Sequence, residues 1–306
     1  MPIVTTDQPL TAARAAALIE QLRQTYPAIT TRQIGATAFG RPLTALAIGN
    51  GPRKVLYTAA HHANEWITGY ILLKFAEELA AAAQSGGRVY GVPARNIVAA
   101  ATIYMVPLVD PDGVDLVTGG IRPGSLEYAI ARGLSDNYPQ IPFPDGWKAN
   151  LLGVDLNLQY PAGWQQARQI KFAQGFNRPG PRDYVGRAPL TQLESQAMAD
   201  YTRELDPALM LAFHSQGQEI YWQFGGITVP GARELGEDFA RTSGYTLTDP
   251  PENSSYAGFK DWFIQTFRRP GYTIEVGKGV NPLPLSQFPE IYRDNVPLLN
   301  IAALGI

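Results

Sequence analysis

The chain of 306 residues contains no cysteine, so it has no disulfide framework, no zinc site built from thiolates and no cysteine nucleophile. Histidine is almost as scarce, with three residues. The formal net charge is −2 and basic runs are absent, which argues against nucleic acid as a partner. A nearly neutral balance is still compatible with a charged small substrate.

Long apolar runs are also missing. The longest candidate, YILLKFAEELAAAA, is interrupted by Lys74, Glu77 and Glu78, as is typical of an amphipathic helix packed on a core and not of a membrane span. The first residues lack a basic region followed by an apolar stretch, so no signal peptide is predicted. The sequence therefore leaves two locations open, cytoplasmic or exported as a processed form, and it indicates no oligomeric state.

Apolar strands alternate with amphipathic helices, without internal repeats or an interdomain linker. This alternation predicts an α/β fold in which residues 1–306 form one domain and a mixed, twisted sheet is covered by helices on both faces. The expected strands are 43–49, 54–60, 101–109, 208–214 and 272–277, and the expected helices are 11–25, 65–83, 191–205 and 288–304.

Four local signals refine this outline. Asp110 to Gly113 indicate a turn after strand 101–109. Thr191 and Glu194 have the spacing of a capping box at the start of helix 191–205. Pro297 is expected to interrupt the last helix. Residues 119–189 are rich in proline, glycine and aromatics with weak periodicity, and loops of that length usually carry function or move.

All three histidines come directly after a predicted strand or close one. The carboxyl ends of strands form the edge at which open α/β sheets build their ligand sites. A catalytic zinc ion commonly takes two histidines and a carboxylate and keeps one position open. Glu65 lies three residues after His62 and four after His61, so either spacing places the carboxylate on one helical face with a histidine. His214 is then the distant ligand.

Glu275 lies inside an apolar strand, where a charge requires a reason. Ordinary explanations exist for each residue, because a histidine at a strand end is often a core or surface residue and a single His-x-x-Glu match is weak. Their combination favours a metal site. A serine hydrolase is the alternative, but the sequence has no G-x-S-x-G elbow, and a serine triad would compete for His214. P-loop and dinucleotide motifs are also absent.

Ordered motifs from His62 to Glu275 resemble the zinc carboxypeptidase (funnelin) family. The matches are His-x-x-Glu-Trp at 62–66, Pro-Asp-Gly at 111–113, Val-Asp-x-Asn at 154–157, His-Ser at 214–215 and the glutamate of the last strand at 275. The resemblance implies a carboxypeptidase-like fold with a sheet of about eight strands. It also implies one Zn²⁺ ion held by His62, Glu65 and His214, which leaves His61 as a packing neighbour.

The resemblance implies roles for three further residues. Asp155 matches the carboxylate that is hydrogen-bonded to the first histidine ligand. Glu275 matches the general base of metal-assisted hydrolysis. Lys148, seven residues before Asp155, stands where the family has an arginine that stabilises the oxyanion. Its alternative interpretation is a solvated loop lysine.

Two departures from the family argue against ordinary trimming of a C-terminus. A carboxypeptidase follows the motif asparagine, here Asn157, with an arginine that grips the terminal carboxylate, and Leu158 stands there instead. Asn64 replaces an arginine inside the first motif. The segments HANEWIT, WKAN, HSQGQEIYW and YAGFKDWFIQ resemble the bacterial γ-D-glutamyl-L-diamino acid endopeptidases, which cut peptidoglycan stem peptides.

This likeness implies hydrolysis of the bond between the γ-carboxyl of D-glutamate and a diamino acid, in peptidoglycan or in muropeptide fragments. Asn157, Gln216 and Lys260 are the candidate substrate-binding residues. Lys260 stands where relatives select the side chain on the leaving-group side and is expected to pair with a carboxylate of diaminopimelate, the alternative being a surface lysine beside Asp261.

The preference between diaminopimelate and lysine stays open at this stage. The chain is expected to be the catalytic domain alone, without a LysM or other accessory module. The alternative functions are a metallocarboxypeptidase of unusual specificity, a deacylase or amidase on the same scaffold, and a non-catalytic wall-binding relative. Retention of both the metal motif and Glu275 argues against the last of these, because a binding module has no need of a general base.

Overall fold

The computed structural model describes residues 2–251 and 254–305. Its main sheet is mixed and has eight strands, as the resemblance implied, and their order is β1-β2-β6-β3-β7-β10-β8-β9. The strands are β1 Ile29–Ala36, β2 Pro42–Ile48, β3 Arg53–Ala59, β6 Ala101–Val106, β7 Leu209–His214, β8 Glu219–Tyr221, β9 Thr246–Thr248 and β10 Gly271–Glu275. A separate pair joins β4 Arg88–Val89 to β5 Val92–Pro93.

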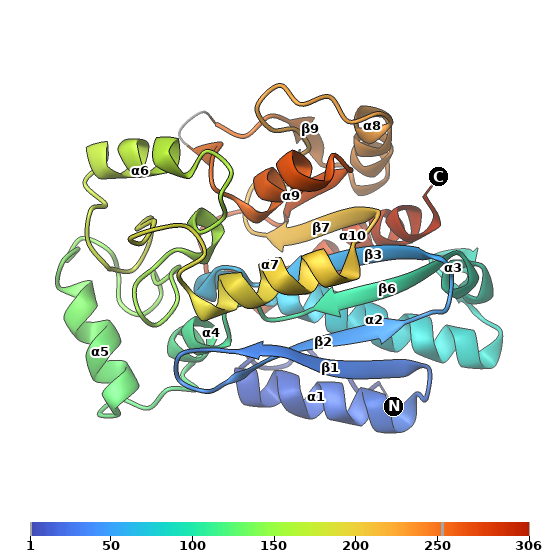
Figure 1. The fold of residues 1–306 in the computed structure, drawn as a ribbon. Coiled ribbons are helices and arrows are strands. Elements are labelled where there is room, and N and C mark those ends of the chain that lie inside the picture. The colour runs from blue at the N-terminus through green and yellow to red at the C-terminus, as the bar shows by residue number, and fades with distance from the viewer. Residues whose placement is uncertain (1, 252–253, 306) are drawn as a thin grey trace.

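Helices cover both faces of this sheet, and Figure 1 shows α7 and α9 in front of it with α2 and α10 behind. The α-helices of the described residues are α1 Ala12–Thr25, α2 Ile67–Ser85, α3 Ala94–Ala100, α4 Pro111–Thr118, α5 Leu126–Ser135, α6 Trp164–Ala173, α7 Leu193–Leu205, α8 Ala232–Ser243, α9 Phe259–Phe267 and α10 Phe288–Leu304. None of these helices has the length and apolar character needed to span a membrane.

The continuous apolar run of β7 follows from burial on both faces. Leu211 and Phe213 join the core that includes α1, α2 and α10, while Met210 and Ala212 join the core beneath α7 and α9. Because successive side chains of a strand point to opposite faces, a strand covered on both sides needs apolar residues at every position. This double burial fixes the centre of the sheet.

The central strands place the chemistry at one edge. β3 pairs in parallel with β6 and β7, and β7 pairs in parallel with β10. The register sets Ala59 beside Phe213 and His214 beside Glu275. The carboxyl ends of β3, β7 and β10 therefore meet, and the chain that leaves β3 carries His62 to the same place.

Two local predictions at helix starts are wrong. Residues 110–113 are the first turn of α4, with Asp110 as the N-cap that accepts a hydrogen bond from the Gly113 N–H at 3.0 Å and with Pro111 at the first position. Thr191 and Glu194 form no capping box, because α7 begins after Gln192. The Thr191 hydroxyl and N–H donate instead to the side-chain oxygen of Gln159, at 3.0 and 2.8 Å.

Two further predictions need correction. Pro297 does not interrupt the last helix: α10 runs through it, and its ring is buried against the core at the cost of one helical hydrogen bond. The segment 119–189 contains α5 and α6 as well as loops. These helices escaped prediction because they bury few side chains, for α5 only Ala131 and Ser135.

Candidate active site

The chain leaving β3 turns sharply to present two of the predicted ligands. His62 precedes a single helical turn, Ala63–Glu65, which brings the Glu65 carboxylate back toward the imidazole. The Thr68 hydroxyl holds this turn, because it donates to the Glu65 carbonyl at 2.7 Å and accepts from the Ala60 N–H at 3.0 Å. His214, the last residue of β7, approaches from the neighbouring strand.

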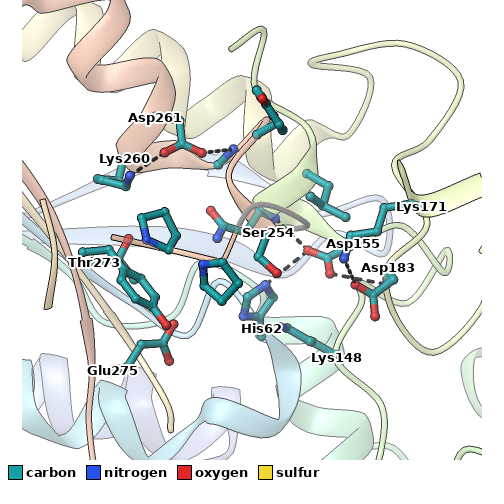
Figure 2. A pocket seen from close by; sticks show the side chains of 17 residues that line it. His62, Lys148, Asp155, Lys171, Asp183, Ser254, Lys260, Asp261, Thr273 and Glu275 are labelled. Carbon is teal, nitrogen blue, oxygen red and sulfur yellow. Dashed lines mark hydrogen bonds and ion pairs between the residues drawn. The ribbon is translucent and has the colours of Figure 1, made fainter. Parts of the chain in front are cut away.

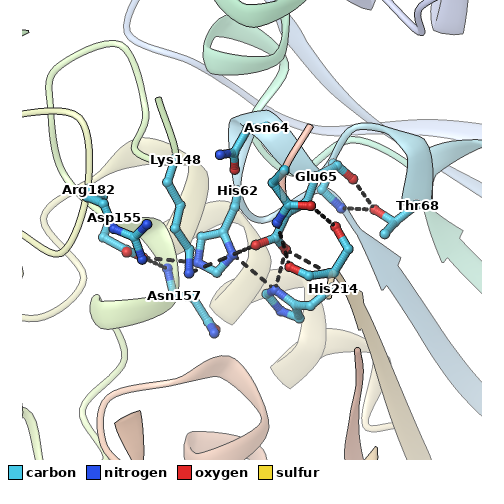
Figure 3. Close-up of polar contacts among 12 residues, drawn as sticks. His62, Asn64, Glu65, Thr68, Lys148, Asp155, Asn157, Arg182 and His214 are labelled. Atoms are coloured by element: carbon cyan, nitrogen blue, oxygen red, sulfur yellow. Dashed lines mark hydrogen bonds and ion pairs between the residues drawn. The ribbon is translucent and has the colours of Figure 1, made fainter. Parts of the chain in front are cut away.

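The three side chains converge on one point (Figure 3). The Nδ1 atom of His62 lies 3.0 Å from Oε1 of Glu65, and Nδ1 of His214 lies 3.0 Å from Oε2 of Glu65. The two Nδ1 atoms are 3.1 Å apart. Ligand atoms about 2.0–2.1 Å from a tetrahedral zinc ion are about 3.3 Å from one another. The spacing and the chemistry of these donors therefore fit a zinc ion.

The electrostatics of the triad suit a divalent cation. Burial raises the pKa of Glu65, but the two histidines outweigh it and hold that pKa well below its usual value, so Glu65 is a carboxylate. Burial lowers the pKa of His214, which leaves a neutral imidazole with a lone pair to donate. Metal ligands must be deprotonated in this way. Burial lowers the pKa of His62, but the charges of Glu65 and Asp155 outweigh it and raise that pKa overall, so a metal ion displaces a proton at this ligand.

Asp155 supports the first histidine from behind. Its Oδ1 lies 3.2 Å from Nε2 of His62, and its two oxygens also accept backbone N–H groups of Asn157 at 3.1 Å and Asp183 at 3.4 Å. A carboxylate at Nε2 favours the proton there and leaves Nδ1 free to bind metal. This is the contact that the sequence predicted for Asp155.

His61 is not one of the residues whose ligand atoms converge. Its ring stacks on His214 with 5.7 Å between centroids and packs on Phe259 at 5.1 Å. Its Nε2 is 3.3 Å from the Tyr160 hydroxyl. Burial, with the neighbouring histidines, lowers its pKa well below the usual value. The structure thus places His61 as a neutral packing partner of the ligand His214.

Lys148 and Glu275 both line the space beside the triad. The Nζ atom of Lys148 is 3.9 Å from Oε1 of Glu65. Burial lowers the pKa of this lysine, but the charges of Glu65 and Asp155 outweigh it and raise the pKa overall, so the side chain is a cation. Burial and then the charge of Glu65 raise the pKa of Glu275 to about 8. Such a perturbed carboxyl in a cleft is typical of an active site.

Two cavities flank the triad. The first, of about 190 Å³, is called the Lys260 cavity, and Figure 2 shows Lys260 and Asp261 across it from His62 and Lys148. The second, of about 700 Å³, is called the Arg182 cleft. Lys148, Tyr221 and Glu275 line both. The two cavities therefore share part of their walls beside the metal site.

Lys260 is buried, with 4% of its surface exposed, so the alternative of a surface lysine is wrong. Its Nζ lies 2.6 Å from Oδ1 of Asp261 and donates to the Gln223 carbonyl at 2.6 Å. Asn157 lines the same cavity and accepts the Phe259 N–H at 2.9 Å, which ties it to the start of α9.

Other predicted positions divide between the two cavities. Leu158 lines the Lys260 cavity and packs on Trp164, so this wall carries no cation at that position. Asn64 and Gln216 line the Arg182 cleft. Arg182 and Tyr221 also line the cleft, and sequence reasoning missed both. Arg182 stands among several arginines of a loop with no local pattern to distinguish it.

A model of the zinc carboxypeptidase family matches residues 15–297. The chain belongs to the zinc carboxypeptidase family. It is 43% identical over 277 residues to gamma-D-glutamyl-L-diamino acid endopeptidase 1 of Lysinibacillus sphaericus, which covers 90% of this chain and 67% of the relative. It is 37% identical over 277 residues to the uncharacterized protein YqgT of Bacillus subtilis (strain 168), with 90% and 72% covered.

Solved structures of zinc carboxypeptidases agree with the fold. The carboxypeptidase A of Helicoverpa armigera matches with a TM-score of 0.70 at 18% identity, over 98% of this chain and 75% of that one. The carboxypeptidase-like fold expected from the sequence is thereby confirmed. With the His62, Glu65 and His214 motif in place, the chain is a zinc metallopeptidase.

Proposed function

We propose that this peptidase hydrolyses the bond between the γ-carboxyl of D-glutamate and a diamino acid, meso-diaminopimelate or lysine, in peptidoglycan stem peptides or their fragments. Residues 1–306 act as one catalytic domain that holds one Zn²⁺ ion. The observation that carries the proposal is the Lys260 cavity, which has Leu158 where a carboxypeptidase grips a terminal carboxylate and a buried lysine farther in. The similarity to a gamma-D-glutamyl-L-diamino acid endopeptidase supports it.

The residues around the triad have different roles in catalysis. When bound, the zinc ion supplies a Lewis acid that polarises the scissile carbonyl and lowers the pKa of water. A carboxylate oxygen of Glu275 accepts a proton from the attacking water and passes it to the leaving nitrogen. The Nζ atom of Lys148, already beside the triad, stabilises negative charge that develops on the carbonyl oxygen. Asp155 keeps the His62 ring oriented.

Lys260 selects the leaving group. An ammonium has three N–H donors; one is donated to the Gln223 carbonyl, while Asp261 forms an ion pair in which its Oδ1 accepts no hydrogen bond among the described residues. A remaining donor is available to a carboxylate on the side chain of the leaving residue, as in diaminopimelate. Asn157 offers its side-chain amide to the backbone of the same residue, while Leu158 gives an apolar wall with no partner for a terminal carboxylate.

The opposite side of the metal site accommodates the acyl part of the substrate. The Arg182 cleft is the larger of the two spaces and is open to solvent, and Gln216 and Asn64 present side-chain amides to it. An enzyme that cuts within a peptide requires room on both sides of the scissile bond. The two cavities, which share Glu275 as a wall residue, provide such room beside the metal site.

The test incubates the zinc-loaded protein with L-Ala-γ-D-Glu-meso-diaminopimelate. Two ordinary α-linked peptides, one with a blocked and one with a free C-terminus, serve as comparison substrates. Release of free diaminopimelate from the first compound alone is the expected result. Trimming of the free α-linked peptide with the γ-linked tripeptide left intact would instead show a metallocarboxypeptidase of unusual specificity and refute the proposal.

A further inference from the structure

Arg182 is a cation in the cleft to which the catalytic scheme gives no role. The cleft-lining residues that the structure describes include two cations, Lys148 and Arg182, and three acidic residues, Glu65, Asp145 and Glu275. Lys148 stands beside the triad. Figure 3 shows both cationic side chains on the same side of His62, with Lys148 nearer to the triad. Arg182 is therefore the cation left to meet an anionic group of a substrate farther along the cleft.

The guanidinium of Arg182 is oriented, and its outer edge is free. Its Nε donates to Oδ2 of Asp183 at 2.6 Å, and Oδ1 of Asp183 is held by Lys171 at 2.7 Å. Among residues 2–251 and 254–305, neither Nη atom of Arg182 has a hydrogen-bond partner. The side chain is 41% exposed. Two parallel N–H groups on a fixed planar fork are the arrangement that binds a carboxylate through both oxygens.

The backbone around Arg182 is tied to the catalytic residues on both sides. The carbonyl of Pro181 accepts the N–H groups of Lys148 at 2.7 Å and Ala149 at 2.9 Å. The N–H of Asp183 donates to the same Asp155 carboxylate that contacts His62. A residue between two such anchors keeps its position relative to the metal triad, which a specificity-determining side chain requires.

We propose that Arg182 binds a carboxylate on the acyl side of the scissile bond, which in the proposed substrate is the free α-carboxylate of the D-glutamyl residue. This inference rests on the proposed function. In a γ-linked glutamyl residue the carbon chain between the scissile carbonyl and the α-carboxylate is short, so this anion enters the cleft close to the reacting atoms. In an α-linked peptide, the chain continues as an amide and no carboxylate need be present there.

Arg182 therefore recognises the γ-linkage itself. Asp145 also lines the cleft, and its carboxylate repels a substrate anion unless a cation meets it. A substrate whose α-carboxylate is amidated lacks the charge that pairs with the guanidinium. The comparison of these two forms of one substrate isolates the contribution of Arg182, because every other contact is the same.

The experiment measures kcat/KM of the zinc-loaded enzyme for L-Ala-γ-D-Glu-meso-diaminopimelate and for its α-amidated form. The wild type is expected to prefer the free acid about 10–100-fold, the range for a hydrogen bond to a charged group of about 1.5–3 kcal/mol. In Arg182→Gln this preference disappears while the amidated substrate is cut as before. Arg187→Gln, which changes an exposed arginine of the same loop, keeps the preference.

Binding gives a second measurement. Calorimetry on zinc-loaded Glu275→Gln protein compares the Kd of the two intact substrates, and the free acid is expected to bind more tightly only while Arg182 is present. Equal kcat/KM of the wild type for both forms would overturn the inference and leave the proposed function standing. Cleavage of neither form would overturn both. Equal losses on both substrates in Arg182→Gln and Arg182→Lys would show a merely structural role and also overturn it.

Discussion

Outside the metal site, the burial of Glu194 lowers the free energy of unfolding, and this effect can be measured. It lies in the first turn of α7 with 2% of its surface exposed, and its Oε2 has no hydrogen-bond partner among the described residues. Burial, followed by the negative charge of Asp112, raises the pKa of Glu194 from 4.5 to about 7. The folded protein therefore holds a proton that the unfolded chain releases at lower pH.

The sign of the effect follows from proton linkage. Between pH 4.5 and about 7 the native state binds more protons than the unfolded state at this position, so the free energy of unfolding falls as the pH rises. At about 1.4 kcal/mol for each tenfold change in the acid constant, the cost above pH 7 is about 3 kcal/mol. Below pH 4.5 both states are protonated and the cost disappears.

The perturbation is Glu194→Gln, which keeps the shape and removes the ionisation. Urea unfolding of both proteins at equal zinc loading, followed by tryptophan fluorescence from pH 5 to pH 8, gives the difference in unfolding free energy. The variant is expected to gain about 3 kcal/mol on the wild type over this range. Glu237→Gln, at an exposed glutamate of α8, should show no such gain. Parallel pH curves for wild type and Glu194→Gln would refute the reasoning.

Three further predictions concern the site. Asp155→Asn should weaken zinc binding about 10–100-fold because it releases the His62 ring, whereas His61→Phe should leave zinc affinity unchanged. Chelator competition measures both affinities, and equal zinc affinity of the two variants would contradict the role of Asp155. Glu275→Gln should keep the bound zinc and lower kcat about 10²–10⁴-fold, and a fully active variant would exclude Glu275 as the general base. Lys260→Met should shift preference from diaminopimelate toward lysine at the leaving position; an unchanged kcat/KM ratio would contradict the role of Lys260.

The sheet was predictable where burial is complete on both faces. β7 is buried at every position, and β3 and β6 are apolar over most of their length because they lie beside it in the centre of the sheet. β1 was missed because it is an edge strand, with Ile29 as its one fully buried residue and a polar, mixed pattern after it. β8 and β9 have three residues each, too few for any period to appear. The sequence therefore predicts the buried central strands but not the exposed or very short strands near the edges of the sheet.

The failed capping box shows why local motifs mislead. Thr191 has the correct residue type and spacing, but the side chain of Gln159 reaches it from a loop 32 residues earlier and takes both of its donors. A motif is a set of available hydrogen-bonding groups, and tertiary contacts compete for them. The metal ligands were easier to predict than the capping box, because histidines are rare in this chain and these residues lie at or just after the ends of strands.

The position of Arg182 beside the site, in contrast, could not be predicted from its local sequence. Nothing in the loop sequence separates it from Arg178 or Arg187, and its place beside the site depends on the pairing of Pro181 with the backbone of Lys148. The metal ligands and Glu275 are therefore attached to the carboxyl edge of the sheet, while Lys148, Asp155 and the groups proposed for selection come mostly from loops and from α9. Loops change more readily than a doubly buried sheet. One scaffold can for this reason keep its zinc chemistry while Leu158, Lys260 and Arg182 redirect it to a different bond.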